Sequence, residues 1–574
     1  MKRLFKYIKK YKYQSILGPL FKLLEAVLEL IVPLVVADII DVGIKSGDTR
    51  YIVARVGLLC LLAAVGFGFA ITAQYFAARA AVGCATAIRH DLFKKIMGLS
   101  YSRIDENGTS TLMTRLTGDV NLVQTGINMV LRLMLRSPLV VAGATIMAFT
   151  IDKKLTIIFL AVIAALYLVV TLITKTTVPM YKGIQGRLDV ILRKTKENLS
   201  GARVIRAFVL ADEEEQSFRQ EIESLNVAQR VAGRVAAVLN PATYCIVNLG
   251  IIALIYFGAI HVDNSVISQG SLVALYNYMS QILVELVKFA GLIVTFNKSV
   301  ASVARINSVL DIEDEPIADR RTDNTDFASS KVAFDGVSFR YGDVEEYALS
   351  DVSFTADKGE RIGVIGGTGS GKTTLVNLIP AFYKASKGHV YIDGVDVSTY
   401  TESELGKIVK VVPQKAVLFS GTIRDNLMWG DESADERTLE RAVEASQSSD
   451  VIRAKENGLD SPVEQGGANF SGGQRQRLTI ARALVGEPQV LILDDSASAL
   501  DYATDAALRT ALKDSYKDST VFIVSQRTSS VMGCNKIIVL DDGNVCGIGT
   551  HDELLQNCEK YREIYDSQYK KEAK

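Results

Sequence analysis

The sequence of 574 residues predicts an all-α membrane domain followed by an α/β domain. The first half contains six apolar stretches of about 20 residues or more, the length that crosses a bilayer. The second half places a glycine-rich loop between an apolar strand and a helix. The mean hydropathy of +0.20 is high for a soluble protein, and the apolar excess lies in the first half.

The overall charge gives no indication of a nucleic-acid partner. Lys and Arg together number 64, Asp and Glu number 64, and the formal net charge is zero. Basic residues gather at the N-terminus, where residues 2–12 contain Lys and Arg but no acid. By the positive-inside rule, we expect a cytoplasmic N-terminus and a first span that is retained rather than cleaved.

The six membrane spans are expected near residues 16–40, 56–86, 132–151, 155–174, 235–260 and 271–295. An even number of spans returns the chain to the cytoplasm. The links expected inside, residues 87–131 and 175–234, are long, charged and patterned as helices, which predicts helices extending well beyond the bilayer. Arg136, near a span end, is expected to snorkel to the cytoplasmic interface. The membrane domain is expected over residues 1–310.

Ionisable residues inside predicted spans are costly and therefore informative. On the first span Lys22, Glu25 and Glu29 share one helical face, and on the sixth Gln281, Glu285 and Lys288 do the same. One interpretation is a polar face lining a substrate pathway, with Glu25, Glu29, Gln281, Glu285 and Lys288 as candidate residues. The other is a set of ion pairs that lock helices together inside the bundle. Both interpretations stay open.

A phosphate-binding loop marks the second half. Residues 366–373, GGTGSGKT, satisfy G-x-x-x-x-G-K-[ST] between an apolar strand at 361–365 and a helix at 373–379. The glycines let backbone N–H groups wrap phosphates, and the helix N-terminus adds positive potential. Lys372 would reach the terminal phosphates, and Thr373 would bind magnesium. The predicted nucleotide-binding residues of this segment are Gly366, Thr368, Gly369, Ser370, Gly371, Lys372, Thr373 and Thr374.

Further motifs stand in the order found in ATP-binding cassette (ABC) proteins. Residues 470–474, FSGGQ, resemble the family's signature sequence, and the apolar run 490–493 leads into Asp494 and Asp495. Residues 109–120 and 197–205 are similar to the intracellular loops of exporter-type members, which end in coupling helices docked on nucleotide-binding domains. The resemblance implies a six-helix type I exporter fold, also called type IV, and a P-loop domain with a helical subdomain. A linker is expected at 311–330 and the nucleotide-binding domain at 331–574.

The resemblance also implies roles for single residues, with ATP and Mg²⁺ as ligands. Tyr341 matches the aromatic residue that stacks on adenine, Gln414 the glutamine that contacts magnesium, and Asp494 the acid that holds magnesium through water. In this family two nucleotide-binding domains close head to tail around two ATP molecules. The signature residues Ser471, Gly472, Gly473 and Gln474 would therefore hold the γ-phosphate bound by another chain. We expect a second cassette chain as partner.

Three positions depart from the family pattern, and one of them is Gln465, which stands where we would align the exporter family's glutamate just before the signature. The other two are catalytic. Asp495 stands where the general-base glutamate is expected, and the missing methylene retracts the carboxylate from the water that it would activate. Gln526 stands where a histidine normally contacts the γ-phosphate. Together with Gln414, these are the predicted catalytic positions of a slow, degenerate site. We interpret the chain as one subunit of a heterodimer, whose non-identical partner carries the missing Glu and His.

This interpretation predicts an ATP-driven exporter of the bacterial inner membrane with its nucleotide-binding domain in the cytoplasm. Hydrophobic or amphipathic drugs, lipids and peptides all stay open as substrates, and family frequency alone favours multidrug-like export. One alternative is a slow homodimeric exporter that uses Asp495 as its base. Another is an ATP-gated channel or regulatory cassette pair, which ATP-dependent accumulation in vesicles would distinguish from a pump.

Overall fold

The computed structural model describes residues 2–313, 324–342 and 344–569. The chain divides into two compact units, Met1–Met97 with Ser110–Ile312 and Gly98–Thr109 with Glu313–Lys574. Half of the expected linker, residues 314–323, lies outside the described residues. In contrast to the expected continuous membrane domain, the short segment Gly98–Thr109 groups with the C-terminal unit.

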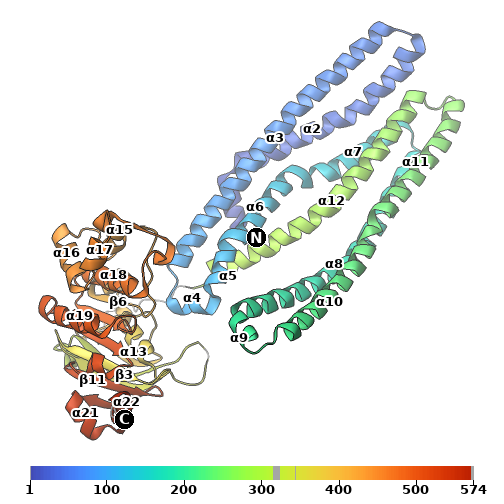
Figure 1. Cartoon of the computed structure of the whole chain (residues 1–574). Coiled ribbons are helices and arrows are strands. Elements are labelled where there is room, and N and C mark those ends of the chain that lie inside the picture. Colours follow the sequence, from blue (N-terminus) through green and yellow to red (C-terminus); the bar gives the residue numbers. More distant parts are fainter. Residues whose placement is uncertain (1, 314–323, 343, 570–574) are drawn as a thin grey trace. The chain divides into compact units, whose positions relative to one another are not determined.

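The described residues of the first unit form helices joined by short turns (Figure 1). The continuous helices α3 and α8 contain 49 and 45 residues. At 1.5 Å per residue each is about 70 Å long, more than twice the roughly 30 Å of a bilayer core. The expectation that helices continue beyond the bilayer is confirmed. The bounds are α1 Lys2–Lys10, α2 Lys12–Asp38, α3 Thr49–Met97, α5 Thr109–Thr114, α6 Val120–Met129, α7 Arg136–Ile151, α8 Thr156–Ser200, α9 Ala202–Ala207, α10 Ala211–Ala237, α11 Leu239–Asp263 and α12 Gln269–Leu310, with π-helical segments η1 Ile39–Ile44, η2 Arg115–Asp119 and η3 Val130–Met134.

Five helical stretches within the described residues are long and apolar enough to cross a membrane. They are Thr49–Met97, Thr109–Ile151, Thr156–Ser200, Ala211–Asp263 and Gln269–Leu310, and they contain five of the six predicted spans. The remaining predicted span, residues 16–40, lies mostly in α2, whose middle carries Lys22, Glu25 and Glu29. The first predicted span, residues 16–40, therefore stays a prediction.

Small and aromatic residues hold the first unit together. On α3 the residues Ala73, Ala77 and Ala80 are fully buried, which lets neighbouring helices approach closely. The helix α12 packs against α2, α6, α7 and α11. Its buried Tyr278 donates a hydrogen bond of 2.7 Å to the Leu30 carbonyl oxygen, which ties α12 to α2.

The second unit is built on a six-stranded sheet in the order β12-β11-β3-β10-β9-β6 and a four-stranded sheet in the order β2-β1-β4-β5. The strands β3, β9 and β10 are parallel and almost entirely buried, as their continuous apolar runs predict. Their carboxyl ends consequently meet at one edge. The bounds are β1 Val332–Phe339, β2 Leu349–Ala356, β3 Arg361–Gly366, β4 Lys387–Ile392, β5 Val395–Asp396, β6 Val409–Val412, β7 Gly421–Thr422, β8 Pro462–Val463, β9 Val490–Asp494, β10 Thr520–Ser525, β11 Lys536–Asp541 and β12 Asn544–Gly549.

A helical subdomain follows β6, as the fold class predicts. It consists of α15 Ile423–Met428, α16 Glu436–Ala445, α17 Ser449–Arg453 and α18 Gly472–Val485, which share a hydrophobic core with the six-stranded sheet. The other helices of the unit are α4 Tyr101–Asn107, α13 Lys372–Leu378, α14 Glu402–Ile408, α19 Tyr502–Ser515, α20 Thr528–Val531, α21 His551–Asn557 and α22 Glu559–Tyr569, with single 3-10 turns at Thr325–Phe327, Val397–Thr399, Gly458–Asp460 and Gln465–Gly467.

Aromatic packing explains why α4 belongs to the second unit. The Tyr101 ring stacks on the Phe382 ring with 4.3 Å between centroids. The Tyr383 hydroxyl donates a hydrogen bond of 2.5 Å to the Asp105 carboxylate. Burial and this hydrogen bond raise the pKa of Tyr383. These contacts attach α4 to the rest of the second unit.

Candidate nucleotide-binding site

The loop between β3 and α13 has the geometry that its glycines predict. Gly369 and Gly371 have φ angles of +84° and +94°, a region that residues with side chains rarely adopt. A Cβ atom at Gly366 would lie only 2.2 Å from the Leu540 carbonyl oxygen. The predicted strand, loop and helix are present in order, and these three positions need glycine.

Lys372 at the start of α13 turns its amine into this loop. Its Nζ donates hydrogen bonds to the carbonyl oxygens of Gly366, at 3.0 Å, and Gly367, at 2.5 Å. Burial lowers the pKa of Lys372, while Asp495 and Asp494 act in the opposite direction. A buried cation among backbone groups suits a polyphosphate, which would supply the negative charge that the loop lacks.

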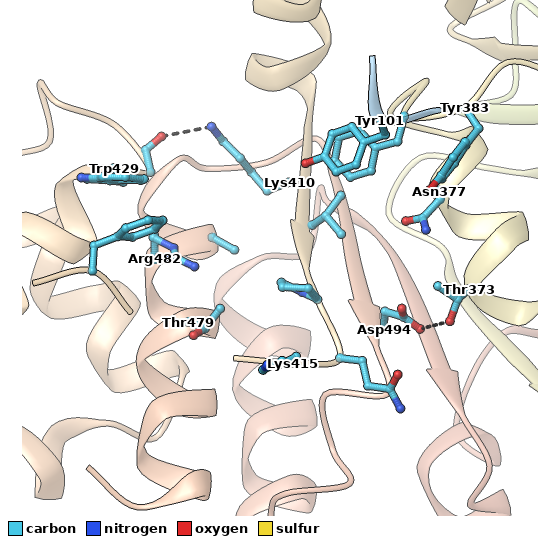
Figure 2. A pocket seen from close by; sticks show the side chains of 17 residues that line it. Tyr101, Thr373, Asn377, Tyr383, Lys410, Lys415, Trp429, Thr479, Arg482 and Asp494 are labelled. Atoms are coloured by element: carbon cyan, nitrogen blue, oxygen red, sulfur yellow. Dashed lines mark hydrogen bonds between the residues drawn. The ribbon is translucent and has the colours of Figure 1, made fainter. Parts of the chain in front are cut away.

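Hard oxygen ligands gather beside the loop at the carboxyl end of β9. The Thr373 hydroxyl donates a hydrogen bond of 3.0 Å to the buried Asp494 carboxylate (Figure 2). Burial raises the pKa of Asp494, and the neighbouring Asp495 adds to the effect. Carboxylate, hydroxyl and amide oxygens are the ligands that Mg²⁺ prefers, so Thr373, Asp494 and Gln414 fit this ion. Bound there, Mg²⁺ would neutralise charge on the phosphates.

Most of the predicted nucleotide-binding and catalytic residues line one cavity of about 340 Å³, whereas Gly366 does not. Tyr341 lies at its edge, and its hydroxyl shares a 2.9 Å hydrogen bond with the Thr374 hydroxyl. Ala348 and Val524 also line the cavity but were not predicted, because neither carries a chemical group that a motif would reveal. The full lining is Tyr341, Ala348, Thr368, Gly369, Ser370, Gly371, Lys372, Thr373, Thr374, Gln414, Asp494, Asp495, Val524 and Gln526.

The two catalytic departures from the family pattern, Asp495 and Gln526, line this cavity. Asp495 has a left-handed backbone, φ +45°, and its carboxylate accepts a 3.2 Å hydrogen bond from the Gln414 amide. Gln526 directly follows β10, its side chain is exposed, and its backbone carbonyl accepts a 2.8 Å hydrogen bond from Gln568. The short Asp495 carboxylate and the uncharged Gln526 amide thus occupy the predicted catalytic positions.

The signature residues lie elsewhere in the same unit. Ser471 caps α18: its hydroxyl accepts from the Gln474 N–H, and the Gln474 side chain accepts from the Ser471 N–H at 2.9 Å. None of Ser471, Gly472, Gly473 and Gln474 lines the cavity at the chain's own phosphate loop. The first turn of α18 leaves backbone N–H groups with no partner inside the helix, which suits an anion from another molecule.

A larger cavity of about 610 Å³ lies on the other side of Thr373 and Asp494. Figure 2 shows Lys410, Trp429 and Arg482 on one side of it and Thr373 and Asp494 on the other. Burial lowers the pKa values of Lys410 and Arg482. Gln414 lines both cavities. Sequence reasoning missed Lys410 and Arg482 because neither belongs to a motif, although Trp429, the only tryptophan, was a visible signal.

In the first unit the structure corrects the expectation for Arg136. Its side chain is buried rather than snorkelling, with ion pairs to Glu29 on α2, at 2.5 Å, and to Glu285 on α12. Lys288 contacts Glu285 at 3.3 Å. Lys22 and Glu25 pair with each other at 2.6 Å, so Glu25 is separate from this network. Arg136 therefore supplies the positive charge that pairs with one glutamate on each of the two predicted polar faces.

Comparison with known proteins identifies the family. Residues 15–286 match the model of the ABC transporter transmembrane region, and residues 349–498 match the ABC transporter domain. The chain is 34% identical to the uncharacterized ABC transporter ATP-binding protein YfiB of Bacillus subtilis, over 100% of this chain and 99% of that one. It is 28% identical to an ATP-dependent lipid A-core flippase of Mannheimia succiniciproducens, over 92% and 91%.

The chain belongs to the ABC transporter family and has the type IV exporter fold. A bacterial Atm1-family ABC exporter solved with ATP bound matches it with a TM-score of 0.79 and 22% identity, covering 98% of both chains. The ABC domain implies ATP binding, usually with Mg²⁺, and transport coupled to ATP hydrolysis. The predicted fold class is confirmed, and the protein is a membrane protein with several spans.

Proposed function

We propose that this chain is one subunit of a heterodimeric, ATP-driven exporter that moves hydrophobic or amphipathic solutes. The observation that carries the proposal is the pair Asp495 and Gln526 at the cavity of the phosphate loop. A cassette site that hydrolyses ATP rapidly needs a general base and a residue that contacts the γ-phosphate. A chain that departs at both positions needs a partner whose own site carries both.

The two nucleotide sites of the pair would then differ. The site on this chain's Lys372, Asp494 and Asp495 would bind Mg-ATP and hydrolyse it slowly. The other site would combine the partner's phosphate loop with this chain's signature, whose Ser471 is an intact helix cap. Most hydrolysis would occur there. ATP binding would favour the closed pair and hydrolysis would reset it.

Exposed apolar residues at the tip of the second intracellular loop support a partner chain. In and beside α9, at the turn between α8 and α10, Val204 is 57% exposed, Phe208 71% and Val209 85% (Figure 1). Exposed apolar residues that cluster at the tip of a cytoplasmic loop favour contact with a partner protein over exposure to water. We propose that this tip docks on the partner's nucleotide-binding domain. The cavity beside Gln414, with Trp429 and Arg482, would receive the partner's own loop.

The proposed location is the bacterial inner membrane, with the nucleotide-binding domain in the cytoplasm. The relatives named lipid A-core flippases support an amphipathic substrate, although they share only 28% and 30% identity with this chain. Multidrug-like export stays the broader proposal for the substrate. No observation favours the channel or regulator over the exporter.

The first experiment is native mass spectrometry of the tagged chain purified from its own membranes in mild detergent. We expect a second, distinct chain of similar size that carries the missing Glu and His. Recovery of two copies of this chain, with steady ATP turnover, would replace the proposal by the homodimer that uses Asp495.

The second experiment repairs the degenerate site with Asp495→Glu and Gln526→His together. We expect turnover to rise at least about tenfold at this site, because the carboxylate reaches the water and the imidazole reaches the γ-phosphate. Single-turnover hydrolysis is measured with the partner's own phosphate-loop lysine changed to alanine, so that only this site contributes. Unchanged hydrolysis in the double variant would contradict the degenerate-site account.

A further inference from the structure

A cavity of about 380 Å³ lies between α2, α7 and α12 in the first unit. Val32, Val36 and Val140 contribute apolar groups to its lining, and Glu29, Gln281, Glu285 and Lys288 contribute polar ones. Pockets of this size hold small molecules or the head of a larger one. A lining with both apolar and charged groups suits an amphipathic ligand.

The charged residues that line the cavity belong to an ion-pair network around Arg136. Arg136 pairs with Glu29 and Glu285, and Glu285 also accepts hydrogen bonds from Ser137, at 2.7 Å, and Lys288, at 3.3 Å. Arg136, Ser137 and Glu285 are buried. Two carboxylates and two cations compensate each other, so the network carries no net charge.

Three polar groups at the cavity keep bonding capacity for a ligand. The side chain of Glu29 is 42% exposed and that of Lys288 is 53% exposed, although each has one ion-pair partner. A carboxylate accepts several hydrogen bonds and an ammonium donates three. Within the described residues, the Gln281 side-chain oxygen is buried and has no hydrogen-bond partner. The cavity therefore offers a negative group, a positive group and an unused acceptor.

The charge balance selects the ligand. A ligand with net charge would leave that charge uncompensated among apolar helices, which costs free energy. A ligand without charges would leave Gln281 unpaired and gain nothing from Glu29 or Lys288. A zwitterionic ligand head matches all three polar groups, because its cation can approach Glu29 and Gln281 while its anion approaches Lys288.

We propose that this cavity binds the head of an amphipathic solute that carries one ammonium, one acidic group and no net charge. The inference rests on the proposed function, because it names the substrate class of the same transporter. Two sources share this chemistry: the headgroup of a zwitterionic phospholipid and a short apolar peptide with free ends.

Two matched ligand sets test the inference on the purified assembly without ATP. The peptide set is a radiolabelled apolar tripeptide with free ends, its N-acetylated form with net charge −1 and its C-amidated form with net charge +1. The lipid set is phosphatidylethanolamine, phosphatidylglycerol and a trimethylammonium lipid with the same chains, detected by native mass spectrometry. In at least one set we expect the zwitterion to bind about tenfold tighter than both charged forms, and that set identifies the source.

A variant with altered charge at the cavity tests the charge preference separately from the overall affinity for apolar ligands. Lys288→Gln leaves the network with net charge −1, so we expect it to lose affinity for the zwitterion and to prefer the cationic form. Lys298→Gln is the matched control, because it makes the same change on the same helix but does not line the cavity. We expect Lys298→Gln to keep the preference of the unaltered chain.

Equal binding of all three charge forms in both sets would overturn the inference, as would an unchanged preference in Lys288→Gln. ATP-driven transport is measured on the same preparation in vesicles, so that the two proposals can fail separately. Transport of other amphipathic solutes without a zwitterion preference would overturn only the substrate class. A zwitterion preference without any ATP-driven transport would overturn the proposed function and retain the site.

Discussion

At the scale of single residues, the chain buries ionisable side chains, and burying a charge costs free energy unless an opposite charge compensates it. Asp494 is buried at the end of β9 beside Asp495 and accepts one hydrogen bond from Thr373. Arg136 is buried in the first unit between two carboxylates. In the first case we expect bound Mg²⁺ to compensate the charge, and in the second the compensating groups are part of the chain. The two cases predict opposite effects of removing the charge.

Removing the charge of Asp494 should stabilise the nucleotide-free protein. Burial raises the pKa of Asp494 in the folded state, so the ionised carboxylate favours the unfolded chain. We expect Asp494→Asn to gain about 1 kcal/mol near neutral pH and still accept the Thr373 hydrogen bond. The gain should shrink as the pH falls toward the raised pKa, where the unaltered Asp494 becomes protonated and its cost disappears.

Thermal unfolding without nucleotide, followed at about pH 7.5 and about pH 5, checks this prediction. The control adds Mg-ATP, which should raise the Tm of the unaltered chain and leave that of Asp494→Asn unchanged. A lower Tm for the nucleotide-free variant at the higher pH would show that Asp494 is stabilised by contacts of the chain itself.

Removing the charge of Arg136 should destabilise the first unit. Arg136→Leu leaves Glu285 buried without its strongest partner, which costs about 3–5 kcal/mol. In the double variant Arg136→Leu with Glu285→Leu, both buried charges are gone and we expect most of the stability to return. Thermal unfolding in detergent measures both variants. Equal losses in the single and double variants would mean that the pair contributes through packing rather than charge.

At the scale of elements, the N-terminus of α18 combines a structural cap with a predicted contact to a second chain. Ser471→Ala removes the hydroxyl that caps the helix and should cost about 1 kcal/mol. Thr401 caps α14 with the same reciprocal pattern but lies outside the signature at residues 470–474, so Thr401→Ala is a matched control. Both variants should lose similar stability, whereas only Ser471→Ala should reduce ATP hydrolysis by the assembly.

Hydrolysis and Tm measured on the same two preparations separate the two roles of Ser471. If Ser471→Ala and Thr401→Ala reduced hydrolysis equally, the loss would follow from stability alone. If neither variant reduced hydrolysis, the signature of this chain would not complete the hydrolytic site.

At the scale of the whole molecule, the chain has surfaces that a single copy does not cover. Phe208 and Val209 at the tip beside α9 are the clearest example. Changing both to Asp should weaken assembly with the partner by at least about tenfold, because each change places a charge in a contact expected to be apolar. Phe208→Leu with Val209→Ile keeps the apolar surface and serves as the control. Native mass spectrometry at decreasing protein concentration gives the fraction assembled, and equal fractions in the two variants would exclude this tip from the interface.

The sequence by itself determined the parts whose information is local. The loop from Gly366 to Thr373 needs a strand before it, a helix after it and glycines between, and each requirement is a short-range property of the backbone. Continuous apolar runs likewise identified β3 and β9. Five of the six predicted spans were found for the same reason, because a span is defined by its own composition.

Only the tertiary structure decided which residues from distant segments meet. Arg136 was expected to reach water, but the fold brings α2, α7 and α12 together around it and provides Glu29 and Glu285 as partners. The attachment of α4 through Tyr101, and the burial of Arg482, were equally invisible in the sequence. The physical reason is that the free energy of a buried charge or ring depends on neighbours far along the chain, and local pattern does not specify them.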